Sequence, residues 1–551
     1  MASNTKDYHF GSALLNLVKL LRLEKEEIIA IYWIAAFAGI LYLVIPLGIQ
    51  SIISFVMAGS ISTSIILLIV VVVVSLILNG ALQIKQLEII EKIEQKLFVR
   101  YALGYAEILP RLDLQRNDEY YMPELVNRFF EISTLQKSIY KLLLEVPGAV
   151  LQIILGTCLL SFYHPFFIGF GFFLLVLVFF IIRITSPMGF QTAMKSSDFK
   201  YQIGDWLEQI SRNIKLFKYV NHHNVHLLKT DSLVAQYLEN KTAYFKILRI
   251  QYWTLIAFKV LIFAALFLLS ILLGLRQEIS VGQFIAADIV ILGVISSVEK
   301  FIQNFDKLYL SVTSLEKLNK ITNAHTEHSG NMMYEPATQG VKITFDKVTF
   351  AYNPSHKVFD KLSFEVKPSE WVQITGPKHS GKTSLINLVS GAYSEYTGSI
   401  LLDDIPMYNY DLNSIRMHTG IVLQEDTLME GTILENIVLT KDRISMPWLL
   451  EISKVTKLYE FIQNQRDGFE TMVLPYKKNL PSSIVMAILL TRAIYHKPNL
   501  LLLEDPFSGY TATEIHRLKD FIVTQFNPTV MIIQNDQQSI SIIEKIIDTA
   551  L

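Results

Sequence analysis

The sequence predicts a multidomain membrane protein: a six-helix α transmembrane domain with long cytoplasmic helical hairpins, followed by an α/β domain with a phosphate-binding loop. Three observations predict this fold class. Apolar residues are concentrated before about residue 305, the composition changes over residues 322–340, and a glycine-containing loop motif lies at residues 376–383. Of the 551 residues, 51% are hydrophobic and only 18% are charged, against about 25% charged in ordinary soluble proteins.

The composition also excludes several classes of site. Lys and Arg (49) nearly balance Asp and Glu (50), so no nucleic-acid partner is expected. The single cysteine, Cys158, excludes an internal disulfide framework and a cysteine-based metal cluster. No cleaved signal peptide is expected, because the N-terminus lacks a short apolar stretch with a cleavage site.

Residues 1–27 are predicted to form an amphipathic cytoplasmic helix at the membrane surface, since leucines such as Leu14, Leu17 and Leu21 alternate with Lys19 and Arg22. The transmembrane domain is expected over residues 28–321. It contains six apolar runs, each near the roughly 20 residues that cross a bilayer. They cover residues 28–50, 62–83, 142–163, 166–184, 253–275 and 280–301.

The distribution of cations sets the predicted orientation. The two long connections, 84–141 and 185–252, are rich in Lys and Arg, whereas the short connections are nearly free of them. Positive loops stay in the cytoplasm, so both long connections and both termini are placed there. Apolar residues at helical spacing in residues 87–93 indicate that the membrane helices continue into the cytoplasm as hairpins.

Two charged residues lie inside predicted spans. Asp288, about halfway along the last span, is expected either to line a translocation path or to make a structural hydrogen bond. Lys259 is nearer the cytoplasmic end and is expected to extend its ammonium group toward the membrane surface.

Polar residues, Gly and Pro mark residues 322–340 as a linker. Beyond it, residues 341–551 are typical of a soluble α/β domain. Short β-rich runs at 341–345, 371–375, 420–423, 500–503 and 530–533 alternate with helical patterns. That alternation predicts a mostly parallel, helix-covered sheet.

The strongest motif in this domain is a phosphate-binding loop of the form G-x-x-x-x-G-K-[ST]. It lies between a predicted strand and a helical run that begins at Ser384, which is the context the motif requires. We expect Lys382 to reach the β- and γ-phosphates of ATP and the Thr383 hydroxyl to bind Mg²⁺. The residues expected to bind the nucleotide here are Gly376, Pro377, Lys378, His379, Ser380, Gly381, Lys382, Thr383 and Ser384.

Other motifs flank this loop, and their order resembles ATP-binding-cassette (ABC) proteins. Phe350-Ala351-Tyr352 lies about 25 residues before the loop, and Gln424 follows a strand and precedes the run Gly431-Thr432-Ile433-Leu434-Glu435-Asn436-Ile437. The resemblance implies that Tyr352 stacks on adenine and that Gln424 contacts Mg²⁺ and senses the membrane domain. The alternatives are a core tyrosine at a strand end and a solvated loop glutamine. The membrane part resembles the six-helix exporters of this superfamily, and bacterial secretion-type exporters in particular.

Four further motifs depart from the family pattern. The signature loop aligns with Leu480-Pro481-Ser482-Ser483-Ile484, anchored by Arg492-Ala493 downstream, and the interdomain loop reads Ser508-Gly509-Tyr510-Thr511 without its aspartate. The two acids after the apolar strand are exchanged to Glu504-Asp505, and Asn535 replaces the switch histidine.

Each departure carries an expectation about the site. Glu504 is expected at the Mg²⁺ position, with its longer arm displacing the carboxylate. Asp505 is expected at the general-base position, with a side chain one methylene too short to reach the water that a base polarises. Asn535 can still donate a hydrogen bond to the γ-phosphate. Ser482 or Ser483 is expected to cap the next helix and to meet the nucleotide of a partner chain.

The resemblance therefore implies an ATP-binding subunit of an ABC exporter, paired with a second half-transporter as a homodimer or heterodimer. It also implies that the chain lies in the lipid bilayer of the bacterial inner membrane and that a periplasmic adaptor protein is a further partner. Hydrolysis is expected to be slow or partner-dependent, and residues 113–124 and 205–215 are expected to make the coupling contacts. The alternative is a non-hydrolysing regulatory subunit that uses ATP as a structural ligand. A soluble P-loop kinase on a membrane anchor explains neither the six spans nor Gln424.

Overall fold

The structure is a computed structural model that describes residues 10–59, 63–117, 122–163, 166–219, 224–275, 281–336, 339–353, 356–424, 427–439, 444–474, 480–534 and 543–549. The chain forms two compact units. Unit 1 contains Met1–Pro110 and Tyr120–Ala324, and unit 2 contains Arg111–Glu119 and His325–Leu551. The short segment 111–119 thus belongs to unit 2, although the chain on both sides of it belongs to unit 1.

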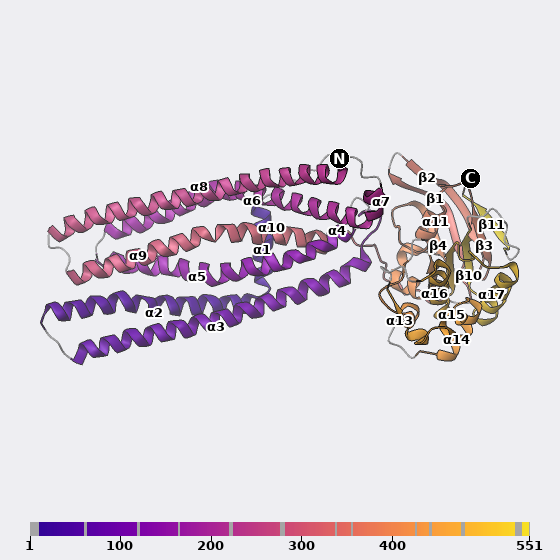
Figure 1. Cartoon of the computed structure of the whole chain (residues 1–551), viewed down its shortest axis with the longest axis horizontal. Coiled ribbons are helices and arrows are strands. Elements are labelled where there is room, and N and C mark those ends of the chain that lie inside the picture. The colour runs from indigo at the N-terminus through magenta and orange to yellow at the C-terminus, as the bar shows by residue number, and fades with distance from the viewer. Residues whose placement is uncertain are drawn as a thin grey trace. The chain divides into compact units, whose positions relative to one another are not determined.

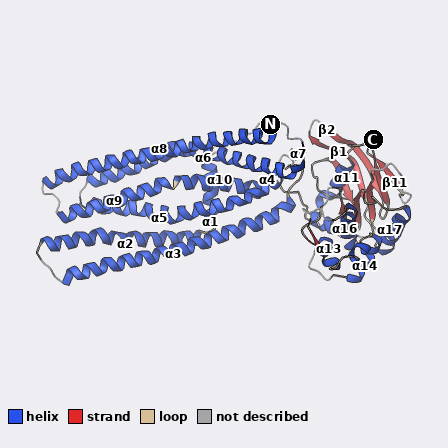
Figure 2. Cartoon of the chain, in the orientation of Figure 1, coloured by secondary structure: helices blue, strands red, loops and turns tan. Residues whose placement is uncertain are grey.

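Unit 1 is a bundle of long helices that run side by side (Figure 1), and its described residues are helical throughout most of their length (Figure 2). Its core lies where α5 packs against α9 and α10. The elements are α1 (Phe10–Arg22), α2 (Lys25–Met57), α3 (Thr63–Ile108), η1 (Leu109–Arg111), α4 (Met122–Asn127), η2 (Arg128–Phe130), α5 (Glu131–Tyr163), α6 (Phe166–Arg212), α7 (Ile214–Tyr219), α8 (Val225–Leu275), α9 (Val281–Gln303) and α10 (Phe305–Thr322).

Several of these helices are longer than the predicted spans that lie on them. Within the described residues, three helical stretches are long and apolar enough to cross a membrane: Lys25–Met57, Thr63–Arg111 and Met122–Phe162. The remaining predicted spans, at 166–184, 253–275 and 280–301, lie on α6, α8 and α9. Helix α3 has 46 residues, so it is about 70 Å long, whereas the hydrocarbon core of a bilayer is about 30 Å thick. Such a helix must continue well beyond the membrane.

The N-terminal helix α1 is amphipathic, as predicted, and crosses the direction of the long helices (Figure 1). Its buried stripe consists of Ala13, Leu17 and Leu20. Directly after it, the buried Glu24 accepts hydrogen bonds from Lys96 at 2.9 Å and Arg100 at 2.6 Å, both on α3. These ion pairs hold the junction of α1 and α2 against α3. Residues 1–9 of the predicted segment lie outside the described residues.

The two charged residues in the predicted spans differ in their surroundings. Asp288 on α9 is exposed and forms no hydrogen bond or ion pair with the described part of the chain, so a structural hydrogen bond within the described chain does not account for it. Lys259 on α8 forms an ion pair with Glu299 on α9. The carboxylate of Glu299 therefore balances the charge of Lys259, which does not depend on the membrane surface alone.

Unit 2 contains the strands and a set of shorter helices (Figure 2). The strands are β1 (Ile343–Asn353), β2 (His356–Val366), β3 (Trp371–Thr375), β4 (Thr397–Leu402), β5 (Ile405–Pro406), β6 (Thr419–Val422), β7 (Gly431–Thr432), β8 (Met472–Val473), β9 (Leu500–Glu504), β10 (Thr529–Ile533) and β11 (Lys545–Asp548). The helices are α11 (Lys382–Val389), η3 (Met407–Asn409), α12 (Leu412–Met417), α13 (Ile433–Val438), α14 (Met446–Val455), α15 (Tyr459–Gln463), η4 (Gly468–Glu470), α16 (Ser482–Tyr495) and α17 (Ala512–Gln525).

Two main sheets organise this unit. The predicted parallel sheet has the order β11-β3-β10-β9-β6, and its central strands β9 and β10 are buried along their whole length. The prediction that the run 341–345 joins this sheet is wrong. It begins β1, which pairs antiparallel with β2 and β4 in a second sheet of order β2-β1-β4-β5. Because β1 and β2 follow one another closely in the chain, they form a hairpin, which parallel pairing would not allow.

Candidate nucleotide-binding site

The phosphate loop connects the buried strand β3 to helix α11, as its sequence predicts. Gly376 and Gly381 have φ angles of +148° and +86°, a region that glycine enters without steric cost. A Cβ atom at Gly381 would lie 2.3 Å from Val358 Cγ1, and one at Gly376 would lie 2.3 Å from Thr549 Oγ1. The loop is therefore packed closely against its surroundings at both glycines, and only glycine fits there.

The side chain of Lys382 points back over this loop. Its Nζ donates hydrogen bonds to the carbonyl oxygens of Gly376 at 3.0 Å and Pro377 at 2.8 Å. Lys382 is also the first residue of α11, whose N-terminus favours negative charge. The loop thus offers an ammonium group and a helix N-terminus at one place, an arrangement that suits phosphate oxygens.

Helix α11 and the ends of strands β9 and β6 bring Thr383, Glu504 and the backbone of Gln424 together beside the loop. The Thr383 hydroxyl donates to Glu504 Oε1 at 2.7 Å, and the backbone N–H of Gln424 donates to Glu504 Oε2 at 3.2 Å. Glu504 ends β9 and is only 6% exposed. Because β6 pairs in parallel with β9, Gln424 leaves the same edge of the sheet as Glu504.

The carboxylate of Glu504, with its longer arm, contacts the Thr383 hydroxyl. The oxygen donors of Thr383, Glu504 and Gln424 are of the type that Mg²⁺ prefers, and Mg²⁺ commonly completes its shell with phosphates and waters. These residues fit a metal ion that arrives with a nucleotide. No group of three His, Cys, Asp or Glu side chains suited to a metal occurs among the described residues.

Of the two remaining candidate catalytic residues, only Asp505 lies within the described residues. Asp505 is half-buried, has a φ of +47°, and donates its backbone N–H to Ile533 O at 2.8 Å. A non-glycine residue with positive φ is uncommon, although Asp tolerates it better than most. The chain thus turns sharply directly after Glu504. Asn535 lies outside the described residues.

Tyr352 lies near the end of β1 with its ring 47% exposed. The ring packs edge-on against Phe350 and Tyr393, with centroid distances of 5.1 and 5.7 Å. Its hydroxyl is 2.6 Å from the Ser384 hydroxyl on α11. The alternative of a core tyrosine is therefore wrong. Ser384 is buried and engaged by Tyr352, so its hydroxyl contacts a protein group rather than solvent.

The altered signature segment leads into α16, and the expectation of a serine cap there is wrong. The residue at the N-cap is Pro481, which makes no side-chain cap hydrogen bond, and α16 begins at Ser482. Ser482 and Ser483 are exposed and make no hydrogen bond in the described part of the chain. Their hydroxyls lie in the first helical turn because proline at the cap fixes where the helix starts.

Two segments that the sequence analysis matched separately contact one another. Arg492 on α16 donates from Nε to the backbone oxygen of Asn436 at 2.6 Å and from Nη2 to its side-chain oxygen at 3.2 Å. Asn436, on α13, is fully buried. In the sequence, Arg492 served only to align the signature loop, and no local signal predicted that it holds α16 against α13.

The interdomain loop is held without the missing aspartate. Tyr510 donates its hydroxyl to Thr456 O at 2.9 Å, and Lys457 donates to Gly509 O at 3.0 Å. Lys457 also pairs with Glu514 at 2.7 Å. That hydrogen bond, with others from Thr511, lowers the pKa of Glu514 to about 2, and burial raises the pKa of Tyr510.

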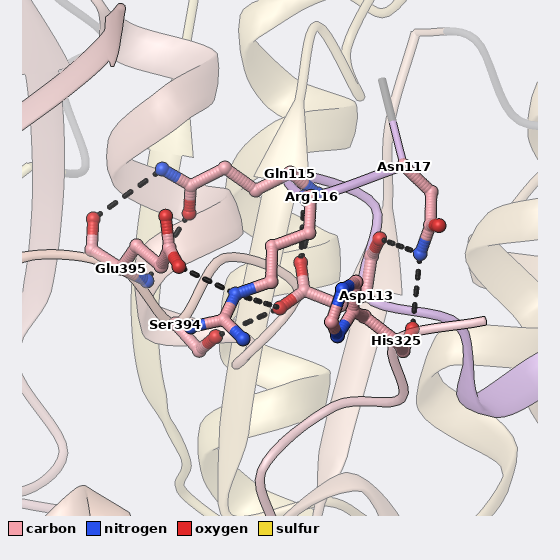
Figure 3. A network of polar contacts seen from close by, with 7 residues as sticks. All are labelled: Asp113, Gln115, Arg116, Asn117, His325, Ser394 and Glu395. Atoms are coloured by element: carbon pink, nitrogen blue, oxygen red, sulfur yellow. Dashed lines mark hydrogen bonds and ion pairs between the residues drawn. The ribbon is translucent and has the colours of Figure 1, made fainter. Parts of the chain in front are cut away.

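Segment 111–119 forms a polar network with the rest of unit 2 (Figure 3). The buried Asp113 accepts hydrogen bonds at one carboxylate oxygen from the backbone N–H groups of Gln115 at 2.9 Å and Arg116 at 3.1 Å. Its own N–H donates to His325 O at 3.0 Å. Asn117 is also buried and donates to Asp113 O and His325 O at 2.7 and 2.9 Å. Residues 113–117 thus form a single closed turn.

The outward side of this turn contacts residues 394 and 395, which precede β4. Arg116 Nε donates to Glu395 Oε1 at 2.5 Å, and Ser394 donates to Asp113 Oδ2 at 3.3 Å. The Gln115 amide exchanges two hydrogen bonds with the backbone of Glu395, at 3.1 and 3.4 Å. Figure 3 shows these side chains converging on one site. The residues of segment 111–119 that take part in this network lie within the predicted coupling segment 113–124, whose residues 118–121 lie outside the described residues.

Comparisons with known proteins agree with this geometry. Residues 359–508 match the family model described as ABC transporter. The chain is 29% identical over 234 residues to the cyclolysin secretion/processing ATP-binding protein CyaB of Bordetella pertussis, which is 42% of this chain and 33% of that protein. It is 28% identical over 281 residues to the leukotoxin export ATP-binding protein LtxB of Aggregatibacter actinomycetemcomitans, covering 50% of this chain and 39% of that protein.

A third relative is the alpha-hemolysin translocation ATP-binding protein HlyB of Escherichia coli, 27% identical over 241 residues, or 43% of this chain and 34% of that protein. The chain thus spans well under half the length of these curated relatives. A solved bacterial Atm1-family ABC exporter with ATP bound has a TM-score of 0.83, at 15% identity, over 95% of this chain and 93% of that chain. The chain therefore contains an ABC transporter domain and has the fold of an ABC exporter.

Proposed function

We propose that the chain is the ATP-binding half of an exporter and that it binds ATP·Mg²⁺ at the phosphate loop of unit 2. The observation that carries the proposal is the contact of Thr383 with Glu504 beside the loop of Lys382. These residues supply a hydroxyl, a carboxylate and an ammonium group at the carboxyl edge of a parallel sheet, where such sheets bind ligands.

Each residue then has a defined role toward the nucleotide. Lys382 exchanges its two loop carbonyl partners for phosphate oxygens, so binding leaves the ammonium group fully hydrogen-bonded. Thr383, Glu504 and Gln424 hold the metal, which neutralises phosphate charge when it is bound. Tyr352 offers a half-exposed ring for stacking on the base.

Hydrolysis is proposed to be slow or dependent on a partner chain. Asp505 stands where a general base is needed but is one methylene shorter than glutamate, and the residue at the start of the signature helix is Pro481. Ser482 and Ser483 are exposed on the first turn of that helix, where a second chain's nucleotide can reach them. Asn535 is proposed to donate to the γ-phosphate.

The partner is proposed to be a second half-transporter, identical or related, with both chains in the lipid bilayer of a bacterial inner membrane. Helix α7 leaves Ile214, Leu216 and Tyr219 exposed, an apolar surface at the predicted coupling segment 205–215 that a partner chain would cover. Segment 111–119 would carry motion between the membrane helices and unit 2. A periplasmic adaptor protein is proposed on the opposite side of the membrane.

The domain limits follow from this proposal. Residues 1–27 form the surface helix, 28–321 the transmembrane domain, 322–340 the linker and 341–551 the nucleotide-binding domain. Both termini are then cytoplasmic. A single cysteine at the exposed Ser329, in a chain with Cys158→Ser, should react with an impermeant thiol reagent only from the cytoplasmic side. Labelling from outside intact cells would contradict the orientation.

Nucleotide titration of the purified full chain tests the site. Lys382→Ala should weaken ATP·Mg²⁺ binding by more than about 100-fold, because two charge-assisted hydrogen bonds of about 1.5–3 kcal/mol each are lost. Tyr352→Ala should cost about 1–2 kcal/mol of stacking. Lys367→Ala is the matched control, since that exposed lysine lies outside the loop. Unchanged affinity in the Lys382 variant would defeat the assignment.

A further inference from the structure

A cavity of about 540 Å³ opens in unit 1 between helices α3, α5 and α10. It shares no residue with the nucleotide site. Its lining includes three lysines, Lys137 and Lys141 on α5 and Lys307 on α10, against one carboxylate, Glu94 on α3. Such an excess of ammonium groups in one hollow attracts an anion.

The lysines are available to a ligand. Lys137 and Lys141 are exposed and form no ion pair within the described part of the chain. Lys307 is half-buried, and within the described residues its one ion pair is with the adjacent Asp306, at 2.9 Å. Two of the three cations therefore have no protein counter-ion among the described residues.

Hydroxyl groups line the same hollow. Thr134 and Ser138 lie one helical turn apart on α5, as Lys137 and Lys141 do, so one helix presents both pairs to the cavity. Ser138 is only 2% exposed, and its hydroxyl makes no hydrogen bond with the described residues. Ser138 lines the cavity, so its hydroxyl can donate a hydrogen bond to a ligand there. Thr134 likewise has no hydrogen-bond partner among the described residues.

The cavity lies at the predicted cytoplasmic end of the membrane helices. Lys141 directly precedes the apolar run 142–163, and Lys137 lies one turn, about 6 Å, further out. The headgroup layer on each side of a bilayer is about 5–8 Å thick. The two lysines therefore span the depth at which lipid phosphates lie.

We infer that this cavity binds the phosphate headgroup of an anionic phospholipid from the cytoplasmic leaflet, with Lys137, Lys141 and Lys307 as counter-ions and the Ser138 hydroxyl as a hydrogen-bond donor. Basic pockets between membrane helices on the cytoplasmic side suit such headgroups. A bound lipid would link α5 to α10. The inference rests on the membrane orientation in the proposed function, but not on nucleotide binding.

The test is thermal unfolding of the purified full chain in detergent micelles, titrated with dioleoyl-phosphatidylglycerol, with dioleoyl-phosphatidylcholine or with inorganic phosphate. Phosphatidylglycerol should raise the unfolding midpoint and the other two should not. The double variant K137Q/K141Q should weaken half-saturation by about 30-fold, since each lysine near a lipid surface contributes about fivefold. The matched control is K195Q/K246Q, which removes two exposed cations from α6 and α8, outside the cavity lining, and should keep the response.

A second variant tests whether the lipid response depends on more than the overall charge of the chain. Ser138→Ala keeps every charge, should leave the midpoint without lipid unchanged, and should weaken half-saturation several-fold. Equal weakening in K195Q/K246Q, or no weakening in K137Q/K141Q, would overturn the inference. So would saturation by inorganic phosphate alone, or loss of a dimer in K137Q/K141Q, which would assign the cavity to an acidic side chain of a second copy. Lys382→Ala should keep the lipid response, which separates this result from failure of the nucleotide site.

Discussion

Replacing Glu504 with glutamine separates a metal-binding role of this carboxylate from a structural one. Glutamine has the same length, and its side-chain oxygen can still accept a hydrogen bond from the Thr383 hydroxyl, now 2.7 Å from Glu504 Oε1. The negative charge is lost, and the amide nitrogen that replaces Oε2 can no longer accept from the Gln424 backbone N–H, now 3.2 Å away. The contact with Thr383 should survive, while attraction to a cation next to Thr383 should fall.

The expected magnitude follows from the contact. Removing a group that supports a metal ligand typically costs 10–100-fold in metal affinity, or about 1.4–2.7 kcal/mol. The dissociation constant for ATP with Mg²⁺ should rise by that factor. In excess EDTA the affinity for ATP should stay level or improve slightly, because a negative charge near the phosphates is gone. The ratio of the two constants is the quantity that changes.

Glu504→Asp tests the length of the arm. Losing one methylene draws the carboxylate back by about 1.5 Å, so the 2.7 Å contact with Thr383 would open beyond hydrogen-bonding distance. Binding of ATP with Mg²⁺ should weaken although the charge is kept. A water molecule that bridges the gap would limit the loss.

The assay is equilibrium titration of the full chain with a fluorescent ATP analogue, with Mg²⁺ and with EDTA. Glu451→Gln is the control, since this exposed glutamate on α14 makes no hydrogen bond in the described part of the chain. An equal change in both conditions for Glu504→Gln would mean that the carboxylate only supports the loop. No change in either condition would remove Glu504 from the site altogether.

Three further predictions concern turnover, the polar network and a half-buried lysine. The purified chain should turn over ATP far below the roughly 1–10³ s⁻¹ usual for enzymes, measured as phosphate release. Asp505→Glu alone should recover little activity, because the other altered motifs remain. Vigorous turnover that Asp505→Asn abolishes would contradict this prediction. Arg116→Glu should speed hydrogen exchange in segment 111–119, and adding Glu395→Arg should restore part of the protection, worth about 0.2–1 kcal/mol for an exposed pair; no restoration would mean that the pair is not coupled. Burial lowers the pKa of Lys320 on α10 to about 8 from 10.5, so the charged form destabilises the fold below about pH 8, and this penalty declines between pH 8 and 10.5. Lys320→Met should therefore raise stability by up to about 3 kcal/mol at pH 7 and by less at pH 9.5; equal gains in thermal unfolding at both pH values would refute the cause.

The sequence alone determined the features that depend on neighbours along the chain. The phosphate loop at 376–383 was predictable because its glycines, lysine and threonine act at fixed spacing within one strand–loop–helix unit. The long helices were predictable because apolar runs and helical periodicity are local signals. The amphipathic helix α1 belongs to the same group, since its buried stripe follows from its own periodicity.

Only the tertiary structure decided the contacts between distant residues. Strand order in the parallel sheet brings Glu504 to Thr383, 121 positions away in the chain, and so places the exchanged carboxylate beside the phosphate loop. The same holds for Arg116 and Glu395, 279 positions apart, and for the cavity that α5 and α10 share. Periodicity shows which face of an element is apolar but not which element covers it. These pairings depend on how whole elements pack, because burial and hydrogen bonding are settled only when the elements meet.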